Sequence, residues 1–323
     1  MTAVLWATAG VAAGGDTAIP AYITAAVDNP GRSAADRARD ALRKPAEVIA
    51  FAGLRPGDRV GELMPGRGYF TAGQTTIEDF LASPAGQDEF GATAPSLLRV
   101  INAVSRNEGR LEAINSYDNA FLSFGSLQWT AGAGSDPGEL AALLARLQQR
   151  SPETFETYFG SHGIGLTGAA GLRTGFLALN GTTLRAPEDK ATLRQPLWAY
   201  RFWRAGHDPA VRACQVAHAL AFIDLFYDRP VHAGLTVRAF LTSEQGVALL
   251  LDEHVNRPGH VPGTLFAAIE AFIASGGNGD PSGWTDQNEA NLLTLYVATR
   301  NGTNMTDSAR RADQIAAAVA TGS

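Results

Sequence analysis

The sequence predicts a mainly α-helical protein of the α+β class, with a small β-hairpin region and a short N-terminal segment. Apolar residues recur at helical spacing in many segments after residue 74, and turn-forming residues separate short β-like runs after Glu108. The 323 residues suffice for one large domain or two ordinary ones. We therefore expect an N-terminal segment over residues 1–73 and a helical domain over residues 74–323.

The composition is that of a globular protein with a formal net charge of −6. This acidic balance disfavours a broad nucleic-acid surface, which is normally basic. Cys214 is the only cysteine, which excludes an intramolecular disulfide and a cysteine-based zinc site, and we expect it in a core helix. No stretch reaches the roughly 20 apolar residues that a transmembrane helix needs. The six histidines show no H-E-x-x-H spacing, so we predict no metal site.

The segment before residue 74 begins with a weakly patterned, Gly/Ala-rich stretch. A helix is expected from Ser33, and Pro45 should break or restart it. A turn follows at residues 56–58, then a short strand at residues 59–63 and a Gly-rich loop at residues 65–68.

Part of this segment resembles the class I methyltransferases that use S-adenosylmethionine. Glu62, Gly66 and Gly68 match the first motif of that family, an acidic residue followed by Gly-x-Gly four positions later. The resemblance covers residues 17–71 and implies that these three residues bind the cofactor. A doubly wound sheet needs further strand–helix units, and no such alternation follows Thr71. Two interpretations stand: an S-adenosylmethionine-dependent methyltransferase, or a fragment that binds no cofactor.

Two helices are expected between residue 74 and Glu108. Thr75 or Thr76 can cap the first, and Pro95 stands near the first position of the second. Gly109 is suited to end the second helix. Its apolar stripe follows the spacing i, i+4, i+7, and position i+11 falls on the same face, so that the stripe consists of Leu97, Ile101, Val104 and Glu108.

Helices and short strands are expected to fill the rest of the chain. Residues 163–193 are Gly-rich with short β-like runs, and Asn180-Gly181 is a hairpin signal. Asp208 can cap the longest helix, with Pro209 at its first position. The helices expected here span residues 136–160, with a break near Ser151-Pro152, and residues 208–228, 246–255, 264–274, 286–299 and 308–321.

Residues 94–130 resemble the lysozyme-like superfamily, in particular lytic transglycosylases and goose-type lysozymes. In these enzymes a helix ends in the catalytic Glu, often followed by Ser, and a Gly-Leu-Met-Gln motif comes after a loop or hairpin. Here Glu108-Gly109 stands at the helix end and Gly125-Ser126-Leu127-Gln128 follows. The resemblance implies that Glu108 is the catalytic acid and Gln128 the motif glutamine. The departures are Gly109, Ser126 and Leu127, which replace Ser, Leu and Met.

The physical chemistry of glycoside cleavage agrees with this role for Glu108. The reaction needs a carboxylic acid that is still protonated near neutral pH. Burial on an apolar helix face raises the pKa of a carboxyl group, and the negative end of the helix dipole acts in the same direction. The alternative is a surface Glu at a frayed helix end. Glu112 is the nearest competitor, but Gly109 should stop the helix, so that Glu112 points elsewhere.

Further candidate residues lie in the segment after Glu108. Asp118 is a candidate second carboxylate that could orient a water, or it is a turn residue. Tyr117 and Trp129 could stack on a sugar ring, with Ser123 and Gln128 as further substrate-binding residues. The alternative for each aromatic residue is a place in the core.

The sequence therefore predicts a glycan-cleaving enzyme that acts on peptidoglycan or a related polysaccharide, by hydrolysis or by lytic transglycosylation, without a cofactor. A methyltransferase and a non-catalytic protein that binds the cell wall are the alternatives. A cell-wall substrate requires export, and Val4–Ala13 resembles the short apolar region of a signal peptide. No Lys or Arg precedes Arg32. We expect a periplasmic or secreted protein, with a cytoplasmic one as the alternative.

Overall fold

The computed structural model describes residues 19–30, 32, 37–38, 40, 44–51, 62–64 and 68–321. The chain divides into two compact units, residues 1–66 and residues 67–323. The first unit contains α1 (Ala21–Val27), α4 (Pro45–Phe51) and β1 (Glu62–Met64), and α1 packs against α4. Pro45 begins a helix, as the sequence predicted for a restart, whereas Ser33 lies outside the described residues.

The second unit is mainly helical with small antiparallel sheets, as predicted. Its first half consists of β2 (Gly68–Thr71), α5 (Ile77–Leu81), α6 (Pro84–Phe90), α7 (Pro95–Glu108), β3 (Ile114–Asn115), β4 (Ser123–Phe124), β5 (Trp129–Thr130), α8 (Glu139–Arg150), α9 (Pro152–Tyr158), η1 (Gly160–His162), β6 (Ile164–Thr167), β7 (Phe176–Leu179) and β8 (Thr182–Thr183). Its second half consists of α10 (Pro187–Lys190), η2 (Ala191–Arg194), α11 (Pro196–Ala205), α12 (Pro209–Tyr227), β9 (Pro230–His232), β10 (Leu235–Thr236), η3 (Val237–Ala239), α13 (Glu244–Asn256), α14 (Val261–Ala274), η4 (Pro281–Gly283), α15 (Asp286–Asn301) and α16 (Ser308–Ala320).

Short antiparallel strands follow α7, where the sequence predicted a hairpin region. Strand β3 pairs with both β2 and β4, and β4 pairs with β5. A second sheet has the order β6-β7-β8. The predicted turn at Asn180-Gly181 connects β7 to β8, and both residues have positive φ, 49° and 84°, as the common two-residue hairpin turn requires.

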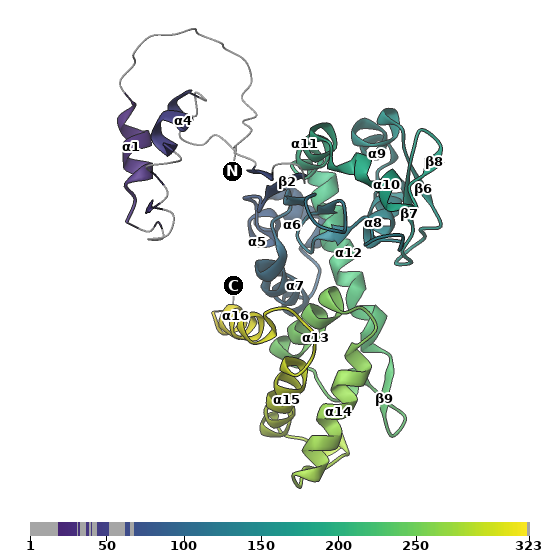
Figure 1. The fold of residues 1–323 in the computed structure, drawn as a ribbon. Helices are drawn as coiled ribbons and strands as arrows, with labels where there is room; N and C mark the ends of the chain where they lie inside the picture. The colour runs from purple at the N-terminus through teal and green to yellow at the C-terminus, as the bar shows by residue number, and fades with distance from the viewer. Residues whose placement is uncertain are drawn as a thin grey trace. The chain divides into compact units, whose positions relative to one another are not determined.

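Helix α12 forms the centre of the second unit (Figure 1). It contacts α6, α7, α8 and α13. Asp208 caps it by accepting a hydrogen bond from Ala210 N at 2.8 Å, and Pro209 occupies its first turn. By length and composition α12 is the one described helix that is apolar enough to cross a membrane, and about half of it is buried inside the protein. Its packing on four helices is that of a core helix, and Cys214 is buried in it as predicted.

Helix α7 is covered by α5, α12, α13 and α16. Burial is concentrated at its residues 100–105, which include Ile101 and Val104. Leu97, which the sequence placed on the same buried stripe, is 38% exposed. The prediction for Leu97 was wrong because the covering helices bury the second and third turns of α7 and leave its first turn in solvent.

Two buried histidines should make the stability of this core depend on pH. His218 packs edge-on against Trp129, and His254 packs against Phe222. Burial, with a smaller contribution from Arg146, lowers the pKa of His218 to about 3. Burial also lowers the pKa of His254 to about 4. Both rings are therefore neutral in the folded protein at neutral pH.

The free energy of unfolding should fall as the pH drops below about 6.5, because the histidines of the unfolded chain then bind protons whereas the buried imidazoles of the folded protein stay neutral. The loss should continue toward the folded-state values, with a slope of up to about 1.4 kcal/mol per pH unit for each group. Urea titrations between pH 7 and pH 4.5 measure it. A His218→Gln variant should have a shallower slope than the wild type, and the exposed His260→Gln control should not; equal slopes in all three proteins would contradict the prediction.

Candidate functional site

Glu108 is the last residue of α7, as the sequence predicted, and its side chain is 14% exposed. Its Oε1 atom accepts two hydrogen bonds. Asn256 Nδ2 at the end of α13 donates one at 3.0 Å, and Arg311 Nη2 on α16 donates the other as part of an ion pair. Sequence reasoning missed both partners, because they lie 148 and 203 residues further along the chain.

The second carboxyl oxygen of Glu108 has a different environment. Among the described residues the hydrogen bonds to Glu108 all reach Oε1, and no donor is found for Oε2. The carboxyl group is therefore fixed through one oxygen, and no described donor holds the other.

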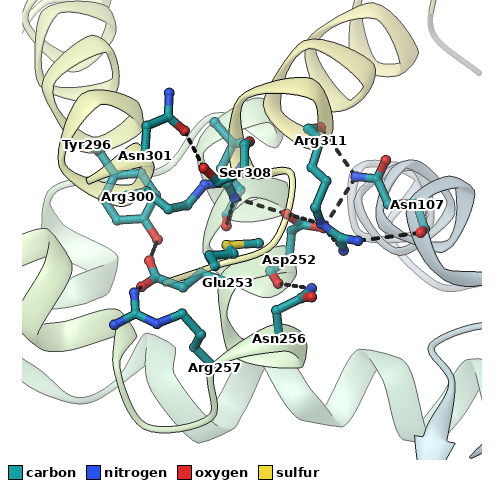
Figure 2. A network of polar contacts seen from close by, with 12 residues as sticks. Asn107, Asp252, Glu253, Asn256, Arg257, Tyr296, Arg300, Asn301, Ser308 and Arg311 are labelled. Atoms are coloured by element: carbon teal, nitrogen blue, oxygen red, sulfur yellow. Dashed lines mark hydrogen bonds and ion pairs between the residues drawn. The ribbon is translucent and has the colours of Figure 1, made fainter. Parts of the chain in front are cut away.

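Arg311 pairs with Glu108 and also belongs to the buried charge network around Asp252, which Figure 2 shows. Its Nη2 and Nε atoms donate to the two carboxylate oxygens of Asp252 at 2.5 Å and 3.3 Å. Arg300 Nη1 on α15 donates to Asp252 Oδ2 at 3.0 Å, and Asp252 and Arg300 are fully buried. The network thus joins α7, α13, α15 and α16.

Glu253, next to Asp252 on α13, forms a second buried cluster. It accepts hydrogen bonds from Thr264 Oγ1 at 2.6 Å and from Arg257 Nη1 at 2.9 Å, and also from the hydroxyl of Tyr296. The hydrogen-bond donors found for this carboxylate all belong to neighbouring side chains of the protein. Through Thr264 and Tyr296 it holds α14 and α15 against α13.

The pKa of Glu108 lies above its ordinary value. Burial of the carboxyl group is the main cause, because desolvation disfavours the charged form. Arg311 and Asn256 act in the opposite direction, while the negative charge of Asp252 adds to the rise. The direction is the one that a general acid needs.

Gly109 brings the end of α7 close to the hairpin that contains Gln128. The helix ends at Glu108 with Gly109 as its C-cap, as predicted, and the φ of 179° at Gly109 is extended. A Cβ at this position would lie 2.9 Å from Ala113 Cβ and 3.2 Å from Gln128 Nε2. The glycine is therefore explained by close approach. Gln128 itself donates from Nε2 to Gly125 O at 2.9 Å, which closes the β4–β5 turn.

Tyr117 and Asp118 lie in the turn between β3 and β4. The Asp118 carboxylate accepts hydrogen bonds from Asn115 Nδ2 at 2.8 Å and Ala120 N at 2.9 Å, which is the arrangement of a turn-forming aspartate. Tyr117 is half-buried and packs edge-on against Phe70, with ring centroids 6.1 Å apart. The described hydrogen bonds do not connect Asp118 to Glu108.

Ser123 and Trp129 lie inside the fold. Trp129 is 2% exposed and packs against His218 and Phe222, and Ser123 is 4% exposed in β4. Their burial fits the core alternative and leaves no ring face of Trp129 for a sugar.

Glu112 points away from the end of α7, as predicted, into a buried site of its own. Its carboxylate accepts from Gln74 N and Thr75 N, each at 3.0 Å, and lies 3.9 Å from His207 Nε2. Because backbone donors hold it, Glu112 anchors the loop before α5 to the segment after α7.

The methyltransferase-like motif is described only at Gly68. Gly66 and the side chain of Glu62 lie outside the described residues. Gly68 has a φ of +148° in β2, and a Cβ there would collide with the carbonyl oxygen of Ser116. Strand packing therefore requires a glycine at this position, and cofactor binding by the motif stays a prediction.

Within the described ranges no group of three His, Cys, Asp or Glu side chains could hold a metal ion. No family model, curated protein or solved structure matches the chain.

A Gly68→Ala substitution should destabilise the second unit by about 2 kcal/mol or more, because it adds strain at positive φ to the collision with Ser116. Chemical denaturation measures the change. Gly165→Ala is the matched control, since its Cβ would meet only Ala178 Cβ, at 3.7 Å, and should cost less than about 1 kcal/mol. Equal stability of the two variants would contradict a packing role for Gly68.

Proposed function

We propose that the protein cleaves a polysaccharide, peptidoglycan or a related glycan, with Glu108 as the general acid. The observation that carries the proposal is the asymmetric carboxyl group at the end of α7. Two N–H donors fix Oε1, and no described donor occupies Oε2. An acid that must present a proton to a bound oxygen needs one such fixed and one reachable oxygen.

In the proposed reaction the proton on Oε2 of Glu108 passes to the glycosidic oxygen as the bond from that oxygen to the anomeric carbon breaks. The oxocarbenium-like carbon then accepts an oxygen nucleophile, either water or a hydroxyl group of the sugar itself. The nucleophile's proton returns to the Glu108 carboxylate, which restores the acid. Hydrolysis and lytic transglycosylation differ only in this second step.

The charges around Glu108 influence whether its carboxyl group is protonated. Arg300 and Arg311 face the carboxylate of Asp252, so a Glu108 anion balances the network and a protonated Glu108 leaves one positive charge in excess. Burial favours the protonated form, as the raised pKa of Glu108 reflects. A substrate that excludes water from Oε2 would strengthen the second effect.

The ion pair with Arg311 also favours a second candidate, a protein that binds the polysaccharide without cleaving it. A carboxylate held in a buried network has a structural use even where no reaction occurs. The two candidates differ in turnover, and one pair of variants separates them.

Glu108→Gln should reduce the clearing of purified peptidoglycan sacculi by at least about a hundredfold, since general acids typically contribute 10²- to 10⁴-fold. Turbidity measures clearing and circular dichroism confirms the fold. The control Glu78→Gln removes an exposed carboxylate, paired with Arg106 at 3.4 Å, and should clear sacculi normally. Sacculi that bind the wild type but are never cleared would support the second candidate, and full activity of Glu108→Gln would overturn the first.

Arg311→Met should move the alkaline limb of the activity profile to higher pH. Arg311 lowers the pKa of Glu108, so its removal raises that pKa, and the protonated acid persists to higher pH. Arg311→Lys keeps the charge but loses the forked contacts with Asp252, and it should move the limb less than Arg311→Met does. The control Arg310→Met removes an exposed arginine of the same helix, paired with Asp307 at 3.2 Å. An unmoved limb in Arg311→Met, at a temperature where the variant is folded, would contradict the assignment of Glu108.

A further inference from the structure

An arginine series in and before α11 stands out in this acidic chain. Residues 191–207 contain Arg194, Arg201 and Arg204 and no Asp or Glu, although the whole protein has a net charge of −6. Helix α11 packs against α9, β2 and β3, at the opposite end of α12 from α13–α16 (Figure 1).

Each of the three guanidinium groups lies over an aromatic ring. The distances from the guanidinium carbon to the ring centroid are 4.7 Å for Arg194 over Phe121, 4.6 Å for Arg201 over Trp198 and 5.9 Å for Arg204 over Tyr158. Stacking restrains an arginine side chain and keeps its charge, so less entropy is lost when its N–H groups bind an anion.

No carboxylate among the described residues lies within 4 Å of these three guanidinium groups; the ion pairs found involve other arginines. The nearby acidic side chains are already used. Asp118 accepts from Asn115 and Ala120, and Asp208 accepts from Tyr158 and Ala210. Arg238 offers the contrast, because it also stacks on a ring, that of Tyr227, but pairs with Asp228 at 2.8 Å.

The series begins beside the turn that carries Tyr117, a predicted substrate-binding residue, and Asp118, the candidate second carboxylate. Arg194 Nη2 donates to the backbone oxygen of Asp118 at 2.5 Å, and Arg194 Nε is buried without a hydrogen-bond partner. Arg201 and Arg204 follow on α11, the first half-buried and the second exposed. Arg201 and Arg204 are three positions apart on α11 and therefore share one side of that helix, whereas Arg194 ends η2, just before α11 begins at Pro196.

We propose that Arg194, Arg201 and Arg204 form a binding surface for a carboxylate-bearing polysaccharide. This inference rests on the proposed function for the kind of polymer that the protein binds, but it does not require that the protein cleaves that polymer. Stacked cations without carboxylate partners attract the anionic groups of such a polymer, and they hold the strand alongside the Tyr117–Asp118 turn. The ligand class is thereby narrowed from glycans in general to glycans that carry carboxylates, such as the peptide-substituted strands of peptidoglycan.

The test is a sedimentation assay with the full chain and sacculi from which phosphate-containing polymers have been extracted. All proteins carry Glu108→Gln, so that the sacculi stay intact. Adding Arg201→Gln and Arg204→Gln should weaken binding about fourfold at low salt, from about twofold for each of the two charge contacts. The control adds Arg238→Gln and Arg310→Gln, which removes the same charge from carboxylate-paired positions, and should bind as the parent does.

Two further measurements make the outcome decisive. Binding by the parent should weaken as NaCl is raised, and sacculi whose carboxylates have been converted to amides should bind the parent and the Arg201/Arg204 variant equally. Equal binding of the two double-arginine variants to untreated sacculi would overturn the inference, as would an unchanged difference on amidated sacculi. Either result leaves the cleavage proposal standing, because clearing by the protein with Glu108 intact tests that proposal separately.

Discussion

The buried ion-pair network around Asp252 is the constraint on which the arrangement of the second unit depends. Asp252 and Arg300 are inaccessible to solvent, and Arg311 is nearly so. Removing one member would strand a buried charge, which typically costs about 3–5 kcal/mol. Because the three residues come from α13, α15 and α16, their pairing fixes how these helices pack. Glu108 joins the network from α7 and is held by the same constraint.

This arrangement gives the candidate acid an environment that its own helix could not supply. The end of α7 places the carboxyl group, whereas α13 and α16 fix one of its oxygens and determine the electrostatics around it. Burial and ion pairing act on the pKa of Glu108 in opposite directions. The arginine series near the Asp118 turn adds a second charged feature, and it suits an anionic ligand on an otherwise acidic protein.

Much of the local structure was predictable from sequence. Pro95, the apolar period and Gly109 predict the helix that ends at Glu108. The Asn180-Gly181 pair predicts the hairpin formed by β7 and β8. The predictions failed at positions whose burial or conformation depends on residues far along the chain. Leu97 shares the period of buried residues but has no helix over it. Gly109 and Gly68 are glycines because other segments approach them closely, and a local sequence pattern does not reveal such an approach.

The helix end that carries Glu108, the turn-rich strands after it and the acidic balance with its arginine-rich exception can all be read from the chain alone. Local signals suffice for these, since helical period, proline and turn residues act within a few positions. The folded arrangement is needed to place Trp129 in the core, to show that Asp118 closes a turn and to pair Arg311 with Glu108. Such placements depend on packing and on Coulomb interactions between residues up to 203 positions apart, and no local pattern specifies them.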